Sequence, residues 1–164
     1  MQVSPVKRTT IFCKNIDTSL SLYKDILGFK IEEDKIVSGK EIGKMIGLSE
    51  CEMHICHLSS ENSSSGIIGL YEITSKNVPE LSKPKVGQIH YGQVAIVLNT
   101  DEPDILYSKL VKSGYDFLTH PTKYEKAQDS DFMRAGIYTE MIFYDPDNVL
   151  VSILGYQKLS KDQS

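Results

Sequence analysis

The sequence predicts an α+β fold made of two similar modules, each running strand, helix and then three strands. One observation is that a β-branched strand, an amphipathic helix, a glycine and a further strand follow one another twice within the 164 residues. A second is that the two helical stretches, LYKDILGFKI and LYSKLVKSGYDF, resemble each other. Their tyrosines, Tyr23 and Tyr107, are 84 residues apart (107 − 23 = 84). We therefore expect an internal duplication of about half the chain.

The first module begins with residues 8–13, whose β-branched and aromatic side chains favour a strand. Asp17 or Thr18 is expected to cap the following helix, and Gly28 to end it. The apolar residues of this helix recur at helical spacing and are Leu20, Tyr23, Ile26 and Leu27. Residues 30–36 then resume an extended pattern.

A short helix is predicted at residues 39–48, because Ile42, Met45 and Ile46 fall on one side of it. Residues 52–58 and 66–73 follow as two strands, joined by a Ser-rich loop that we expect to be mobile. This loop is expected over residues 59–65.

The second module follows a linker that contains two prolines and few apolar residues. Residues 93–98 form its first strand, and Thr100 or Asp101 caps a helix with Pro103 in its first turn and Gly114 at its end. Residues 116–118 extend again, and residues 140–144 and 149–156 form a hairpin around the turn formers of residues 145–148. The expected boundaries are 6–74 for the first module, 75–88 for the linker, 89–157 for the second module and 158–164 for a flexible tail.

The composition excludes several classes of partner. A formal net charge of -4 and the absence of a basic stripe argue against a nucleic-acid partner or an anionic membrane surface. The sequence has no apolar run long enough to span a membrane and no apolar signal core at its start. Three cysteines are an odd number in a chain that does not need disulfides, which predicts reduced thiols and a cytoplasmic protein.

Three stretches of the chain resemble the vicinal oxygen chelate superfamily, which includes glyoxalases, bleomycin resistance proteins and extradiol dioxygenases. They are SLSLYKDILGFKI, GQVAIVL and FYDPDNVLVSILG, and the resemblance spans roughly residues 6–157. It implies paired βαβββ modules whose eight strands form an open curved sheet around a cavity, with helices on the outer face. It also implies a small-molecule ligand in the cavity and, together with the base rate for soluble proteins, a homodimer.

Catalytic members of this superfamily hold a divalent metal with one side chain from each of four strands. The matching positions in this sequence are Arg8, Gly69, Gln93 and Ser152. None of the four is a His or a carboxylate, and a guanidinium has no lone pair to give a metal. We therefore expect no metal and no other cofactor at these positions.

The stretch CEMHICH, residues 51–57, raises the alternative of a relocated metal centre. Alternate residues of a strand share a face, so we expect Met53 and Ile55 to pack under helices. Glu52, His54 and Cys56 would then line the cavity in a row, whereas a zinc site needs ligands that converge on a point. His57 would point away from them, and the stretch is interpreted as a strand without a metal.

The residues expected to bind a ligand are Arg8, Glu52, His54, Tyr71, Gln93 and Ser152. Arg8 is a partner for an anionic oxygen, although an internal salt bridge, for example to Glu52, is the alternative. For Tyr71 the alternative role is packing, and for Gln93 it is hydrogen bonding to backbone groups. Ser152 has no base beside it in sequence, which argues against nucleophilic catalysis. His54 is the first candidate for proton transfer.

Two functions remain open at this point. The first is a metal-independent protein that binds a small anionic or amphipathic organic molecule, as the bleomycin-binding branch does. The second is a lyase, an isomerase or a dioxygenase-type enzyme, with metal-free acid–base chemistry or a relocated metal centre. Fold alone does not decide between them.

Overall fold

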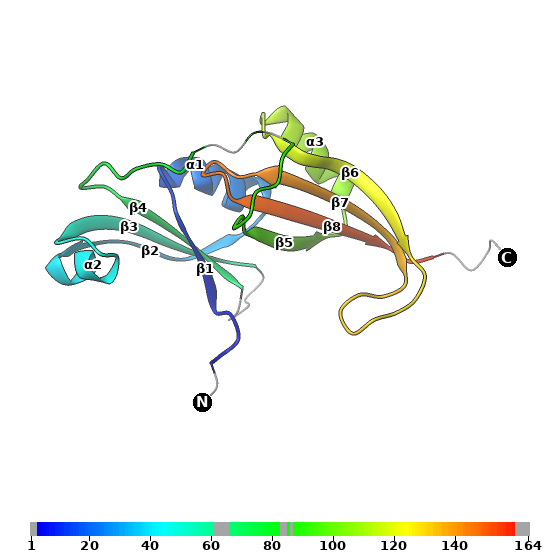
Figure 1. Cartoon of the computed structure of the whole chain (residues 1–164), viewed down its shortest axis with the longest axis horizontal. Helices are drawn as coiled ribbons and strands as arrows, with labels where there is room; N and C mark the ends of the chain where they lie inside the picture. The colour runs from blue at the N-terminus through cyan, green and yellow to red at the C-terminus, as the bar shows by residue number, and fades with distance from the viewer. Residues whose placement is uncertain (1–2, 61–65, 83–84, 86, 160–164) are drawn as a thin grey trace. The chain divides into compact units, whose positions relative to one another are not determined.

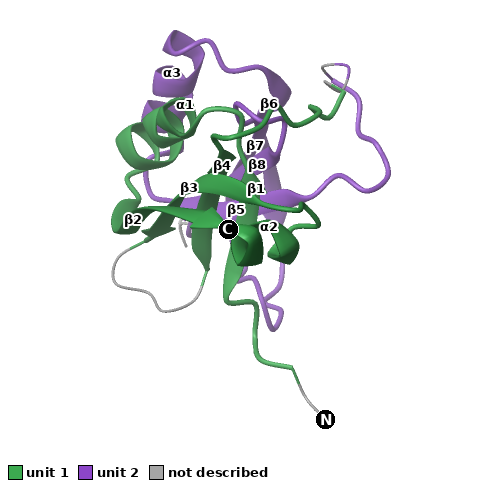
Figure 2. Cartoon of the chain, turned by 90° about the vertical axis from the view of Figure 1, so that its left-hand side faces the viewer, with its two compact units in different colours: residues 1–82 green, residues 83–164 purple. Residues whose placement is uncertain are grey.

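The structure is a computed structural model that describes residues 3–60, 66–82, 85 and 87–159. These residues form an α+β fold with eight strands in two four-stranded sheets (Figure 1), which confirms the predicted fold class. Most of the expected Ser-rich loop, three linker residues and most of the expected tail lie outside the described residues. The chain divides into two compact units, 1–82 and 83–164, which are coloured separately in Figure 2.

The sheet of unit 1 has the strand order β1-β4-β3-β2, in which β1 runs parallel to β4 and the other pairs are antiparallel. Its strands are β1 (Arg8–Phe12), β2 (Lys30–Gly39), β3 (Cys51–Ser59) and β4 (Ile67–Ile73). Its helical segments are α1 (Ile16–Leu20), the π-helical η1 (Ser21–Ile26) that continues it, and α2 (Lys40–Met45). A parallel β1–β4 pair needs the crossover that α1 and the intervening strands supply.

The start of α1 differs from the prediction. Asn15, rather than Asp17 or Thr18, is the cap, and its side-chain oxygen accepts a hydrogen bond from the backbone N–H of Thr18 at 2.8 Å. Asn is as good a cap as Asp and better than Thr, so the earliest eligible residue begins the helix. Gly28 follows η1 with φ +81°, a left-handed conformation that glycine adopts without strain.

One face of the unit 1 sheet carries the helix-side core. Ile11, Cys56 and Leu70 lie on this face and are buried, as are Leu22 and Tyr23 of η1. The backbone N–H of Ile16 donates to the Glu72 carboxylate at 2.9 Å, which ties α1 to the same face. Ile11, Ile68 and Leu70 therefore face the helices, whereas Met53 and Ile55, which were expected under the helices, lie on the opposite face of the sheet.

Unit 2 repeats this order as β5-β8-β7-β6, with β5 parallel to β8. Its elements are β5 (Ala95–Thr100), α3 (Pro103–Lys112), β6 (Phe117–Lys126), β7 (Gly136–Tyr144) and β8 (Leu150–Gln157). Gly155 lets α3 approach β8 closely, because a Cβ there would lie 2.7 Å from the ring of Pro103. Val151, Ile153, Met141, Phe143 and Leu110 are buried in this unit.

Several strand and helix boundaries in unit 2 differ from the prediction; β7, for example, begins at Gly136 rather than at residue 140. β5 begins two residues later than expected, and Glu102 rather than Thr100 or Asp101 precedes α3, without a side-chain cap bond. β6 is far longer than residues 116–118, because it is an edge strand whose polar residues and Pro121 hide its pairing with β7. No helix in the described part of the chain has the length and apolarity that crossing a membrane requires.

Candidate functional site

Strand register in unit 1 decides which side chains share a face. Thr10 lies beside Gly69 and Phe12 beside Tyr71 on the parallel pair, and His57 lies opposite Gly69 on the antiparallel pair. Paired residues in a sheet project to the same side. We call the surface formed by Arg8, Thr10, Gly69, Tyr71 and His57 the Arg8 face; it is the face opposite Ile11 and Leu70.

The guanidinium of Arg8 is held in one place by three contacts. Its Nε donates to Thr10 Oγ1 at 3.0 Å, its Nη1 lies 3.0 Å from His57 Nε2, and its carbon lies 5.2 Å from the centre of the Tyr71 ring. Gly69 makes room for it, because a Cβ there would lie 2.9 Å from Arg8 Cδ. Among the described residues no carboxylate forms an ion pair with Arg8, so its charge is available to a ligand.

His57 links Arg8 to an acidic side chain on β2. Its Nδ1 lies 2.8 Å from Glu33 Oε2, and its Nε2 lies 3.0 Å from the Tyr71 hydroxyl. Partial burial lowers the pKa of His57, the charge of Arg8 lowers it further, and the Glu33 carboxylate opposes both. The pKa of Glu33 is itself lowered, chiefly by its hydrogen bond from Lys35. His57 is therefore neutral near pH 7, beside a fixed cation.

We expect the free energy of unfolding to decrease as the pH falls below about 6.5, the ordinary pKa of histidine. In that range the unfolded chain binds a proton at His57 that the folded chain still resists, so stability rises with pH. Denaturant unfolding between pH 7.5 and pH 5 measures the slope, which should be shallower in His57→Gln than in the wild type. Equal slopes in the two proteins would contradict the assigned environment of His57.

Two expected members of the site lie on the other face of the sheet. His54 pairs with Glu72 across β3 and β4, and its Nε2 lies 2.6 Å from Asp34 Oδ1. Glu52 accepts a hydrogen bond from Thr74 Oγ1 at 2.8 Å, so the expected alternative of a salt bridge to Arg8 does not form. The prediction that His54 and Glu52 share a face with Gly69 is therefore wrong, and His57 takes the place expected for His54.

Gln93 and Ser152 belong to unit 2, whereas Arg8 belongs to unit 1. Gln93 lies before β5, where its side-chain oxygen accepts from the His90 backbone N–H at 2.7 Å; its buried Nε2 has no protein partner. Ser152 is buried and donates to Glu140 Oε1 at 2.8 Å. Sequence reasoning did not single out Glu140, which is a diagonal neighbour of Ser152: the β7–β8 register pairs Ser152 with Ile142 and Glu140 with Leu154.

The parallel pairing of β1 with β4 and of β5 with β8 changes the residue assigned to one of the four metal-ligand positions of the family. Phe12, 12 − 8 = 4 residues after Arg8, pairs with Tyr71, and Val97, 97 − 93 = 4 residues after Gln93, pairs with Ser152. Tyr71 is thus the unit 1 counterpart of Ser152. With either Gly69 or Tyr71 at that position, the side chains at the four family positions include a guanidinium and no carboxylate. Such a set of donors does not suit a divalent metal.

CEMHICH is a strand, as predicted. Its two cysteines, Cys51 and Cys56, are free thiols and are buried, and Cys13 is also buried. Burial, followed by the charge of Asp34, raises the pKa of Cys56 to about 11, so this thiol is a poor source of thiolate. In the described residues no three His, Cys, Asp or Glu side chains are grouped closely enough to hold a metal ion.

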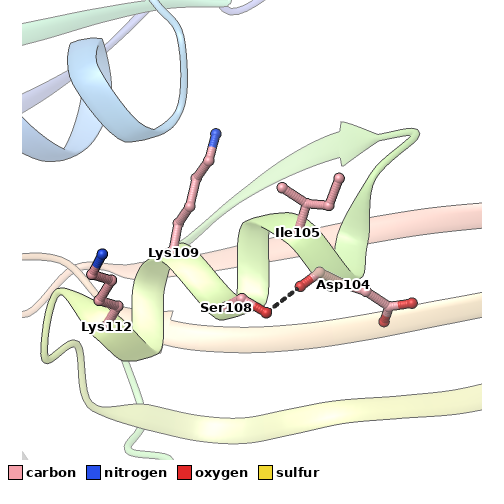
Figure 3. A pocket seen from close by; sticks show the side chains of 5 residues that line it. All are labelled: Asp104, Ile105, Ser108, Lys109 and Lys112. Atoms are coloured by element: carbon pink, nitrogen blue, oxygen red, sulfur yellow. Dashed lines mark hydrogen bonds between the residues drawn. The ribbon is translucent and has the colours of Figure 1, made fainter.

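A surface pocket of about 420 Å³ lies along α3 in unit 2 (Figure 3). It is lined by Asp104, Ile105, Ser108, Lys109 and Lys112, and Ser108 Oγ donates to the Asp104 carbonyl within the helix. These side chains are largely exposed to solvent. None of the residues predicted to bind a ligand lines it, and its polar groups do not converge on a common point.

Comparison with known proteins agrees with the fold described above. The family model described as the glyoxalase/bleomycin resistance protein/dioxygenase superfamily matches residues 6–153. No curated protein matches the chain in sequence.

Solved structures share the fold at low sequence identity. A glyoxalase family protein from Bacillus cereus is 15% identical with a TM-score of 0.72, over 95% of this chain and 96% of that one. A glyoxylase/bleomycin resistance protein/dioxygenase domain from Frankia sp. EAN1pec is 18% identical with a TM-score of 0.57, over 95% and 100%. A superfamily member from Sphaerobacter thermophilus is 17% identical with a TM-score of 0.54, over 93% and 98%.

Proposed function

The chain belongs to the glyoxalase/bleomycin resistance protein/dioxygenase superfamily, and from that premise we propose that it binds a small organic anion on the Arg8 face without a metal ion. One observation carries the proposal: Arg8 occupies a family metal-ligand position, its guanidinium is held by Thr10, His57 and Tyr71, and it forms no ion pair with an acidic group of the described residues. A cation that the protein has already positioned can hold an anionic oxygen directly.

The donors of Arg8 support an anion as the ligand. A guanidinium has five N–H groups; one is used by Thr10 and one by His57, so 5 − 2 = 3 remain for a ligand. Phe12 is 54% exposed and packs edge-on against Tyr71, with ring centres 5.9 Å apart. These rings offer an apolar surface close to the cation, which suits an aromatic or aliphatic carboxylate.

The same arrangement argues for binding without a metal. A divalent cation near Arg8 would meet a fixed positive charge, and the family positions supply no carboxylate to offset the repulsion. Glu33 is the acidic group of this network, and its carboxylate already binds Lys35 and His57. An anionic ligand is attracted by the same charge that repels a metal.

The test measures benzoate binding by isothermal titration calorimetry, before and after exhaustive chelation of metals. We expect Arg8→Met to weaken binding about tenfold or more, because a hydrogen bond to a charged group contributes about 1.5–3 kcal/mol. Lys7→Met is the matched control: it removes one positive charge at the residue that precedes β1, and Lys7 takes part in none of the contacts that hold Arg8. Chelation should leave the wild-type affinity unchanged.

Two results would contradict the proposal. One is an Arg8→Met protein whose affinity equals that of the wild type and of Lys7→Met. The other is binding that disappears on chelation and returns with a divalent metal, which would restore the metal-dependent alternative.

We also propose a homodimer in the cytoplasm, with no nucleic-acid or membrane partner. The superfamily resemblance and the frequency of two-fold dimers support the assembly. Three buried cysteines, an odd number, support a reducing compartment, and a net charge of -4 supports the absence of a polyanionic partner. A solution mass near that of a single 18.4 kDa chain, by light scattering, would exclude the dimer.

A further inference from the structure

A line of hydrogen-bonding groups crosses the Arg8 face from Glu33 through His57 to Tyr71 and Arg8. An ionised carboxylate can only accept hydrogen bonds, so the ring nitrogen that faces Glu33, Nδ1, carries the hydrogen of the neutral imidazole. The other nitrogen, Nε2, therefore has a lone pair. Arg8 and Tyr71 both place donors 3.0 Å from it, which is consistent with an acceptor at that position.

We propose that the ligand of this face is a carboxylate that also carries a hydroxyl group, and that His57 Nε2 accepts the hydroxyl hydrogen while Arg8 binds the carboxylate. The inference rests on the proposed function, since it assigns a second contact to the same ligand. His57 is then the residue that sets specificity, and Glu33 is a positioning residue that keeps the lone pair on the ligand's side of the ring.

The two contacts support each other. In the absence of ligand, Nε2 is shared by Arg8 Nη1 and the Tyr71 hydroxyl, although one lone pair serves a single strong hydrogen bond. A hydroxyl that takes this lone pair releases an Arg8 N–H for the carboxylate. An ether, a ketone or a fluorine at the same place would present a second acceptor to Nε2. Nε2 would then keep its Arg8 and Tyr71 donors, and no Arg8 N–H would be released for the carboxylate.

A second His–carboxylate pair, in which the His also lies on β3, serves as a control. His54 and Asp34 form a His–carboxylate pair at 2.6 Å, three residues away on β3 and on the opposite face. Substitutions in that pair change the same functional groups on the same two strands. They should leave ligand selection unchanged, because neither side chain faces Arg8.

The test compares 3-hydroxybenzoate with its blocked analogue 3-methoxybenzoate by calorimetry at pH 7.5. The wild type should bind the hydroxyl compound roughly tenfold more tightly, which is the effect of one hydrogen bond. His57→Phe keeps a ring beside Tyr71 and should abolish the preference, while Glu33→Gln should reduce it. His54→Phe and Asp34→Asn should bind both compounds as the wild type does.

A pH series separates this role from a structural one. Arg8, Glu33, Lys35 and Tyr71 are the charged or titratable groups around His57. Protonation turns Nε2 into a donor, so the preference for the hydroxyl should disappear in acid, while attraction for the carboxylate increases. A midpoint that moves to lower pH in Glu33→Gln, in which the neighbouring negative charge is lost, would identify His57 as the titrating group.

The outcomes distinguish the two proposals. If both benzoates bind with equal affinity and the binding depends on Arg8, the proposed function stands and the specificity inference is overturned. If the preference persists in His57→Phe, or is lost equally in His54→Phe, the inference is likewise wrong. If no benzoate binds, the proposed function fails and the inference fails with it.

Discussion

Replacing Phe143 by alanine should lower the free energy of unfolding of unit 2 by about 3–5 kcal/mol, the usual cost of deleting a buried phenyl ring. Phe143 is 0% exposed. Its ring centre lies 5.7 Å from that of Tyr115 and 5.9 Å from that of Phe117. The substitution removes apolar contacts and leaves a cavity that a twisted sheet under α3 cannot easily close.

Urea unfolding followed by far-ultraviolet circular dichroism measures the loss. Phe132→Ala is the matched control, because Phe132 belongs to the same unit but is 96% exposed, so its removal should change stability by less than about 0.5 kcal/mol. A small loss for Phe143→Ala, close to that of the control, would show that the helix side of this sheet is not packed as described.

The two hairpins explain why sequence reasoning succeeded in one unit and failed in the other. The turn between β7 and β8 is short, and Asp145 closes it by accepting hydrogen bonds from the backbones of Asp147 and Val149, both at 2.8 Å. Such a turn fixes the register, so the hairpin of β7 and β8 could be predicted from the sequence. The connection between β3 and β4 is longer, and the sequence could not say that His57 lies opposite Gly69.

A second cause of the wrong facing predicted for His54 and His57 is that β3 is buried on both faces. Met53 and Ile55 are buried on one face, and Cys56 and Leu58 on the other. An apolar pattern identifies the core face only when the opposite face is polar, and this strand has no polar face. The prediction gave the helix side to Met53 and Ile55, which placed His54 with Arg8 and turned His57 away. Glu33 was missed for a related reason, since it lies on an edge strand whose residues are mostly polar.

Replacing Gly69 by valine should remove anion binding as completely as Arg8→Met does, while the chain stays folded. A Cβ at this position would lie 2.9 Å from Arg8 Cδ and 3.0 Å from Tyr71 Cε1, and valine adds two methyl groups beyond it. The side chain of Arg8 is long and flexible, so it can swing away at moderate cost to the fold. Its guanidinium would then leave the Tyr71 ring and the His57 nitrogen.

A double-mutant cycle decides whether Gly69 acts through Arg8. If the glycine serves only to admit the guanidinium, Gly69→Val adds nothing in an Arg8→Met background, and the two losses of benzoate affinity are strongly non-additive. Gly69→Ala should give an intermediate loss, because the methyl group meets only the far part of a side chain. Additive losses in the cycle would mean that valine disturbs the sheet itself, and the assignment of Gly69 as the space that positions Arg8 would be wrong.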